Sequence, residues 1–486
     1  MRQLCSILGG LLLASVLCFA GEYESKVKIS GGAGLELGQV VHGSYLLNYT
    51  DYQEIIKGWQ ERFLYRLIYD MTLTERIRMV MDIEGQISFS YPQILNPIES
   101  QGLKYLFFPE RIEGMYTLGN PERPYLQFGV GYFPYKFNPD AKNLGELEFR
   151  SGTYPLWVIS NFNHCYGKLL GLRISSTLFG SLKQDLMLTS EALMFPTQDY
   201  SLSYVMHYSL ARVLDIGAGL SLAHLFSTEG KLTNSNTDPS GSYLKANGDT
   251  AYYSFKGIKP AAMVAFDPKP LLPSALRDLL GKDDARLYGE VFVSGWENRK
   301  NYDSAVLFDT AKQMQQYYAN RSDRTVVMFG FNWPTHPLLS YTIVPGIAAY
   351  FLNNKELITP GTCMAGWAGI ASGMGLWLLE KYTNIKTGLD VLSLEFEHFP
   401  NRYPNSYRYA LERNMATPFN SLTQKQFSWR WSCYAKKTFL GKFFIVGQVA
   451  RDHMRTTFPD IKLSEKEDVL KYGKDWWWVC SFGFKI

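Results

Sequence analysis

Histidines and serines are the residues of this chain that could carry hydrolytic chemistry, and their spacing decides whether that chemistry is expected. The seven histidines are scattered: His42, His164, His207, His224, His336, His398 and His453. A hydrolase needs a histidine next to an acid or a serine. His207 shares the phase of an alternating segment with Ser201, Ser203 and Ser209, which makes it the best candidate base. No metalloprotease, serine-hydrolase, P-loop or dinucleotide-binding motif occurs at a meaningful position, so we expect neither an enzyme nor a bound metal or cofactor.

The charged residues follow a stricter pattern than the histidines do. In the segment 76–91, "RIRMVMDIEGQISFSY", the odd positions are almost all apolar and the even positions are mostly charged or polar. Side chains on a strand alternate between its faces, so this pattern predicts a strand with one apolar and one ionic face. The preceding segment 59–71 alternates in the same way. We expect the ionic faces of both segments to line an interior lumen: Arg62, Arg66, Arg76, Arg78, Asp82 and Glu84.

The charges of these two segments also predict how they pair. If residues whose numbers sum to 148 pair across a tight turn at 72–75, Asp70 faces Arg78 and Arg66 faces Asp82. Opposite charges then meet on one face while apolar side chains meet on the other, which favours this register.

The same alternation recurs along the chain, in the segments 26–37, 201–210, 214–225, 427–437 and 476–486. These segments are longer than the usual strand of about 5–6 residues. Their apolar faces are rich in tyrosine, tryptophan and phenylalanine, which suits the aromatic girdles of a barrel in a membrane. The hydrophobic fraction of 46% is too ordinary for a bundle of membrane helices.

The connections between these strands alternate between short and long. Short connections are expected near 180–183, 211–213, 334–340 and 437–441. Long connections are expected near 38–58, 92–103, 134–166, 227–250, 297–324, 400–425 and 453–475. Short turns at one end and long loops at the other are typical of outer-membrane barrels. We therefore predict an all-β fold, a transmembrane antiparallel up-and-down barrel of about 18 strands, with 16 strands as the fallback. A soluble sandwich, with a second layer over every apolar face, is the alternative.

Three segments depart from this rhythm. The link 196–199 is short where a long one is expected. The link 267–286 is long where a short one is expected, and residues 274–281 within it predict a short helix capped by Ser274. The segment 361–379 has no charge. We expect a glycine-rich strand or a segment tucked into the lumen there, with a membrane-spanning helix as the alternative.

The amino-terminal twenty residues predict a secretory signal rather than part of the fold. Arg2 is followed by an apolar run and by a small-x-small cleavage site that ends at Ala20. We therefore expect a signal peptide at 1–20 and one barrel domain at 21–486. The four cysteines beyond the signal are widely separated and predict neither a disulfide framework nor a zinc site. The net charge of +4 is too weak to imply a nucleic-acid partner.

A resemblance to a known family is carried by "QFGVGYFPYKFNPDAKNLGELEFRSGTYP" at 127–155. This stretch resembles the strand and third outer loop of Gram-negative outer-membrane porins, including the phosphate-selective type. The terminal "SFGFKI" resembles their closing strand, although the chain ends in Ile486 rather than in an aromatic residue. In such porins the third outer loop commonly folds inward and narrows the channel. The resemblance therefore implies a constriction formed by Lys136, Asp140, Lys142, Glu146, Glu148 and Arg150. Phosphate selectivity is not carried over, because the expected lumen mixes basic with acidic residues.

The resemblance further implies what the chain would do. It points to a passive channel for small hydrophilic solutes in the outer membrane, without a cofactor. Membrane lipid, lipopolysaccharide, the barrel-assembly machinery and small polar solutes are the implied partners, and porins of this type are often homotrimers. An adhesion or glycan-binding barrel that uses the outer loops 227–250 and 400–425 is one alternative. An outer-membrane hydrolase that uses His207 is another.

Overall fold

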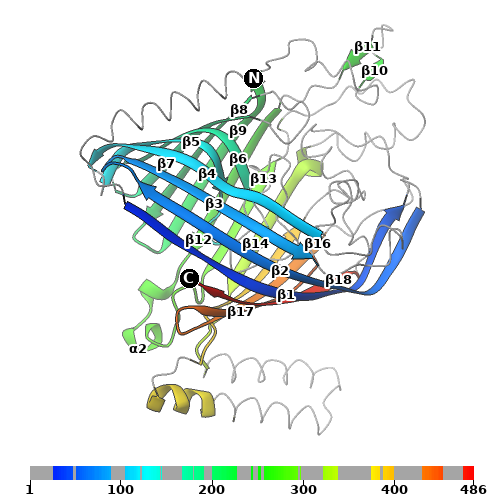
Figure 1. Ribbon diagram of the computed structural model, residues 1–486, viewed down its shortest axis with the longest axis vertical. Coiled ribbons are helices and arrows are strands. Elements are labelled where there is room, and N and C mark those ends of the chain that lie inside the picture. The colour runs from blue at the N-terminus through cyan, green and yellow to red at the C-terminus, as the bar shows by residue number, and fades with distance from the viewer. Residues whose placement is uncertain are drawn as a thin grey trace.

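The structure of the chain is a computed structural model, in which a closed antiparallel barrel of 16 strands dominates (Figure 1). It describes residues 26–47, 51–88, 104–120, 123–142, 144, 167–178, 180–190, 200–226, 242–244, 250–252, 257–293, 296, 321–337, 371, 374–383, 387–398, 429–451 and 474–486. Each barrel strand pairs with its neighbours in chain order, and β18 returns to pair with β1. The predicted all-β, up-and-down architecture is thereby confirmed.

The barrel strands occur at regular intervals along the chain. They are β1 (Lys26–Leu47), β2 (Asp51–Thr72), β3 (Ile77–Ser88), β4 (Lys104–Asn120), β5 (Arg123–Tyr135), β6 (Gly167–Leu178), β7 (Leu182–Ser190), β8 (Tyr200–Leu210), β9 (Leu214–Phe226), β12 (Gly257–Phe266), β13 (Leu287–Val293), β14 (Thr325–Asn332), β15 (Val391–His398), β16 (Trp429–Phe439), β17 (Phe443–Arg451) and β18 (Trp476–Lys485). The smaller of the two predicted strand counts is therefore the barrel's. Two further strands, β10 (Ser242–Leu244) and β11 (Thr250–Tyr252), form a separate two-stranded sheet.

The two faces of the barrel wall differ as the alternation predicts. On the interior face Glu84 is fully buried and Asp82 is 4% exposed. On the exterior face the strands present large apolar residues to the outside, such as Leu35, Ile112 and Phe329. A register slip of one residue would exchange these faces along a whole strand, so the pattern fixes which side of each strand faces inward.

Most connections at one end of the barrel, which we call the turn end, are short, and most at the opposite, loop end are long. The exceptions are the long links 267–286 and 333–390 at the turn end and the short link 48–50 at the loop end. The short links at the turn end have two to four residues each: 73–76, 121–122, 179–181, 211–213 and 440–442. In the link after β8, Val213 N donates to Leu210 O at 3.0 Å, and both Ala211 and Arg212 have a positive φ. Two consecutive left-handed residues give the turn a twist that matches that of its flanking strands.

Two predicted connections are wrong. The segment 38–58 is not a loop, because β1 and β2 continue through it and pair as far as Leu47 and Asp51. The link expected to be short at 334–340 is instead long and runs from 333 to 390. The next barrel strand after β14 is β15, with which β14 pairs directly. The link between β7 and β8, expected to be short at 196–199, takes in residues 191–199.

The two segments expected to carry other structure also differ from prediction. In the link 267–286, which is long as predicted, the helix α2 spans only Ser274–Arg277, and its N-cap is Pro273 instead of Ser274. A 3-10 helix, η3 (Lys269–Leu271), precedes it, and another, η4 (Arg321–Arg324), precedes β14. Within 361–379, residue 371 and residues 374–379 are helical, in a helical run that extends to 383, so a strand is wrong for that part. This helix, yellow in Figure 1, lies outside the barrel beyond the end that carries α2, so this part is not tucked into the lumen either.

Within the part of the chain that the structure describes, no helix combines the length and the apolar character needed to cross a bilayer.

The predicted register of β2 with β3 has the right faces but the wrong offset. Asp70 pairs with Val80 and Arg66 with Glu84, so paired residues sum to 150 instead of 148. The turn lies one residue further along the chain than expected, at 73–76: Leu73 N donates to Ile77 O, and Thr74 Oγ1 accepts from Ile77 N at 3.0 Å. The predicted ion pairs nevertheless form, as diagonal contacts between neighbouring rungs. Long arginine side chains reach such diagonal positions easily.

We predict that this register can be verified by cross-linking on the exterior face. Tyr69 pairs with Met81, so a Tyr69→Cys/Met81→Cys variant should form a disulfide under mild oxidation. The matched variant Tyr69→Cys/Met79→Cys, which the offset of 148 would pair, should couple much less. The measurement is the shift of a thiol-blocked sample on a denaturing gel. Preferential coupling of the second pair would contradict the register.

Candidate functional site

The interior of the barrel contains the candidate site, and its first part is the segment that follows β5. Residues 136–142 and 144 leave the wall and turn inward, where Phe137 is 2% exposed and Asn138 and Ala141 are fully buried. Phe137 belongs to an apolar cluster that joins β5–β8 with β12–β14 across the interior. Outer loops normally lie on the surface, because their backbone polar groups need water. The described residues of the third outer loop thus take the inward course that the resemblance implies.

The tip of this segment is attached to the opposite wall by Glu395. Glu395 lies on β15, eight strands from β5 around the barrel (β6, β7, β8, β9, β12, β13, β14, β15). Its carboxylate accepts the backbone N–H of Lys142 and, at 2.8 Å, that of Leu144. Tyr288 donates its hydroxyl to the same carboxylate at 2.8 Å, and Glu395 is 1% exposed. A charged acceptor with several donors in a buried place makes strong hydrogen bonds, so this contact fixes the loop tip.

A second attachment joins the segment to the link before β13. Asp140 lies 3.0 Å from the guanidinium of Arg286, which also contacts Asp215 at 2.5 Å. Lys142 reaches Asp283 at 3.7 Å. Burial raises the pKa of the Asp140 carboxyl, and the nearby positive charges of Arg286 and Lys142 oppose this rise. A raised pKa means that burial costs the charged carboxylate more than these two cations return. The charge of Asp140 therefore contributes little to holding the loop in place.

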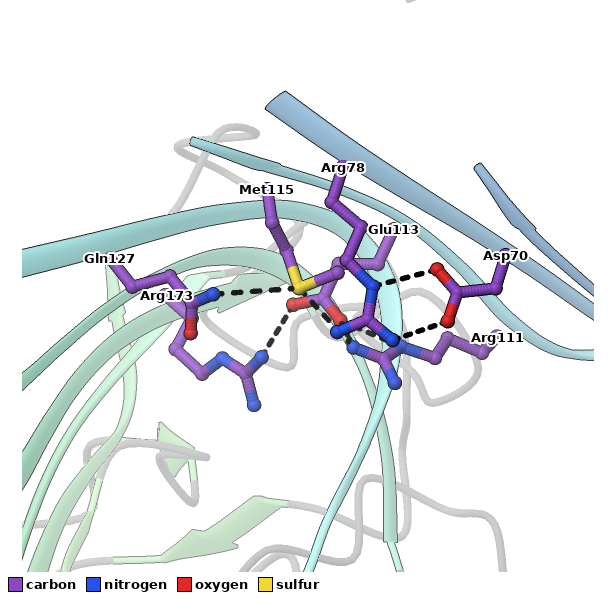
Figure 2. A network of polar contacts seen from close by, with 7 residues as sticks. All are labelled: Asp70, Arg78, Arg111, Glu113, Met115, Gln127 and Arg173. Atoms are coloured by element: carbon purple, nitrogen blue, oxygen red, sulfur yellow. Dashed lines mark hydrogen bonds and ion pairs between the residues drawn. The ribbon is translucent and has the colours of Figure 1, made fainter. Parts of the chain in front are cut away.

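On the wall that faces β12–β15, the strands β2–β6 carry a network of charged side chains (Figure 2). Glu113, which is 1% exposed, accepts from Arg111 Nε at 2.8 Å on one oxygen and from Arg173 Nη2 at 2.7 Å on the other. Asp70 accepts from Arg78 through Nε at 2.7 Å and Nη2 at 2.5 Å. Arginine forks that bind carboxylates in this way are held in a defined orientation.

Backbone irregularity and a glycine make room for this network. A bulge in the pairing of β3 with β4 sets Asp82 opposite Arg111 and Ile83 opposite Pro109, which leaves Glu110 as the extra residue. A proline is acceptable in a strand at such a bulge because it has no N–H to donate. On β5, a Cβ at Gly129 would lie 2.5 Å from Glu113 Oε1, so only glycine leaves space for that carboxylate.

The structure places the predicted residues unevenly. Of the six expected at the constriction, Lys136, Asp140 and Lys142 lie inside the barrel, and Lys136 donates to Ala141 O at 2.5 Å. The remaining three lie outside the described residues: Glu146, Glu148 and Arg150.

The predicted lumen residues mostly form ion pairs within the wall. Arg62 contacts Glu36 at 2.6 Å, and Arg66 donates to Asp82 at 2.7 Å. Glu84 is fully buried on the same face. Arg76 is different, because it precedes β3 in the turn and is exposed there.

Sequence reasoning missed Arg286 and Tyr288 as site residues. Arg286 lies at the end of a long link and Tyr288 in a short strand. Nothing in their spacing indicates that they meet a loop about 145 residues earlier in the chain. The candidate base His207 makes a ring contact with Phe137, with 5.6 Å between ring centroids. Ser203, one of its expected partners, donates to Ser221 at 2.9 Å. His207 therefore contacts the inward loop through its ring. Over the residues that the structure describes, no group of histidine, cysteine or acidic side chains could hold a metal ion.

Comparison with known proteins gives matches among solved structures alone. No protein family and no curated protein matches the sequence. Salmonella typhi OmpF in complex with daunomycin matches with 9% identity and a TM-score of 0.44, over 95% of this chain and 98% of that one. Pseudomonas putida OprB matches with 7% identity and a TM-score of 0.44, over 94% and 93%. A mutant of the Rh. blastica porin matches with 7% identity and a TM-score of 0.38, over 95% and 100%. Likenesses of this size support no conclusion about function, so the function is inferred from the barrel itself.

We predict that Glu395 and Asp140 contribute differently to holding the loop tip. A Glu395→Gln change replaces one acceptor oxygen by an NH2 group, which leaves a buried N–H without a partner and should cost about 2–3 kcal/mol locally. Hydrogen exchange of the segment that contains Lys142 and Leu144 should then become faster.

The matched change Asp140→Asn removes a charge whose carboxyl pKa is raised in the folded state. An acid with a raised pKa disfavours the folded form above that pKa, so loss of the charge should leave exchange at neutral pH unchanged or slower. For the same reason, protonation of Asp140 favours the folded loop. Exchange of the wild-type segment should therefore not become faster, apart from the intrinsic effect of pH on exchange, as the pH falls toward the pKa of Asp140. Faster exchange in Asp140→Asn than in Glu395→Gln would contradict this assignment.

Proposed function

We propose that this chain is an outer-membrane porin, a passive channel for small hydrophilic solutes. The single observation that carries the proposal is a closed barrel with an apolar exterior, an ionic interior and an inward-folded third loop attached to the β13–β15 side of the interior. An apolar exterior suits lipid, where a charge at the midplane costs on the order of 2–4 kcal/mol. An ionic interior suits a water-filled passage.

Solvent access to the interior charges supports a passage over a sealed barrel. The side chains of Arg111 and Arg173, which lie in the middle of β4 and β6, are 25% and 18% exposed, although both point to the interior face. A fully packed interior would cover such groups. The third-loop residues Lys136, Asp140 and Lys142 would narrow the passage on the side of β12–β15, and the network around Glu113 would line the facing wall.

The remaining parts of the proposal depend on a location in the outer membrane. Residues 1–20 would direct secretion and be removed, and the barrel-assembly machinery, lipid and lipopolysaccharide would be its partners, with assembly as a homotrimer. No hydrolytic role is proposed, because the contacts of His207 are with the inward loop.

A planar-bilayer recording tests the channel directly. We predict that the purified full chain, added at low concentration, raises conductance in uniform steps, because each inserted barrel opens one water-filled path. The control is protein denatured by heat before addition. A folded barrel, judged by its faster migration when unheated on a denaturing gel, that inserts without conductance would overturn the proposal.

A further inference from the structure

The hydrogen-bond donors of three arginines in Figure 2 are only partly used. A guanidinium has five N–H donors. Arg78 uses Nε and Nη2 on Asp70, and Arg111 uses Nε and Nη2 on Glu113. Arg173 uses Nη2 on Glu113 and lies over the ring of Phe133, at 4.9 Å from its centroid. Among the described residues no acceptor contacts the Nη1 group of any of the three arginines.

The carboxylates of the same network, by contrast, are hydrogen-bonded through both of their oxygens. Both oxygens of Asp70 accept from Arg78, and the two oxygens of Glu113 accept from different arginines. Three arginines against two carboxylates leave a net charge of +1 (3 − 2) in the network. The network therefore offers an anion both free donors and a net positive charge, whereas that charge repels a cation.

The arginines lie close together on an accessible part of the interior wall. Arg78 pairs across the strands with Met115, whose sulfur lies 3.4 Å from Nη2 of Arg111. The side chains of Arg78, Arg111 and Arg173 are 50%, 25% and 18% exposed, while that of Glu113 is completely buried behind them. Their position on the interior face separates them from lipid headgroups, so a ligand would come from solution.

From these observations we infer that Arg78, Arg111 and Arg173 form an oxyanion-binding subsite, which takes the carboxylate or phosphate group of a solute in the lumen. This inference rests on the proposed channel function and adds the class of solute to it. Guanidinium groups match the geometry of carboxylate and phosphate oxygens. Glu113 is the positioning residue, because it holds Arg111 and Arg173 on either side of one carboxylate. It is too buried to compete with the solute for solvent-facing donors.

The test uses inorganic phosphate as the probe and the full folded chain in detergent. Isothermal titration calorimetry should show saturable phosphate binding, and in bilayers phosphate should reduce the chloride current with the same concentration dependence. The Arg111→Gln change removes one donor group and should weaken binding on the order of tenfold. Arg78→Gln should weaken it less, because that side chain is half exposed. It also leaves both partners of Glu113 in place, so it provides a second test if Arg111→Gln does not fold.

Arg76→Gln is the matched control. It removes the same charge two positions from Arg78, but from an exposed turn residue, so phosphate binding should remain within about twofold of wild type. An equal loss in Arg76→Gln and Arg78→Gln would overturn the subsite in favour of a general field effect, as would the absence of any phosphate binding. A channel that conducts without binding phosphate would refute this inference alone. A barrel that binds phosphate but never conducts would refute the channel and leave the subsite standing.

Discussion

Pairing of β1 with β18 closes the barrel, and every other feature of the molecule presupposes that closure. It joins the two ends of the sheet and removes the free edges that a membrane could not solvate. The ladder runs from Gly32 and Lys485 to His42 and Trp476, and Gly31 and Ile486 exchange two further backbone hydrogen bonds beyond it. Side chains reinforce the seam as well. Glu36 on β1 contacts Arg62 on β2 at 2.6 Å and accepts from Ser481 on β18 at 3.1 Å.

Closure then determines where charge can go. A closed wall has one outside and one inside, so the alternation of each strand sorts its side chains into a lipid-facing set and an interior set. Ionic groups inside are costly unless they are paired. The interior of this barrel meets that requirement with local pairs on neighbouring strands, such as Arg66 with Asp82 and Arg78 with Asp70.

The interior has two unlike walls as a result. On the side of β12–β15 the third loop is attached through the buried carboxylate of Glu395 and two ion pairs, so protein backbone occupies that part of the lumen. On the side of β2–β6 no such attachment is seen among the described residues, and the arginines of the Glu113 network keep solvent-facing donors. A solute in the lumen would thus meet fixed backbone on one side and, on the other, positive groups held in a defined orientation. That asymmetry is what gives the proposed passage chemical character.

The faces of the strands, the closed all-β architecture and the inward third loop could all be predicted from the sequence. These features depend on local alternation, on link lengths and on a recognisable loop sequence, each of which lies within one stretch of chain. The strand count, the offset of β2 against β3 and the partners of the loop tip emerged only in three dimensions. A shift of two residues preserves every face, so alternation cannot distinguish an offset of 148 from one of 150. Likewise, Glu395 meets Leu144 only because closure brings β15 opposite β5, and a contact across 251 positions leaves no periodic trace in the chain.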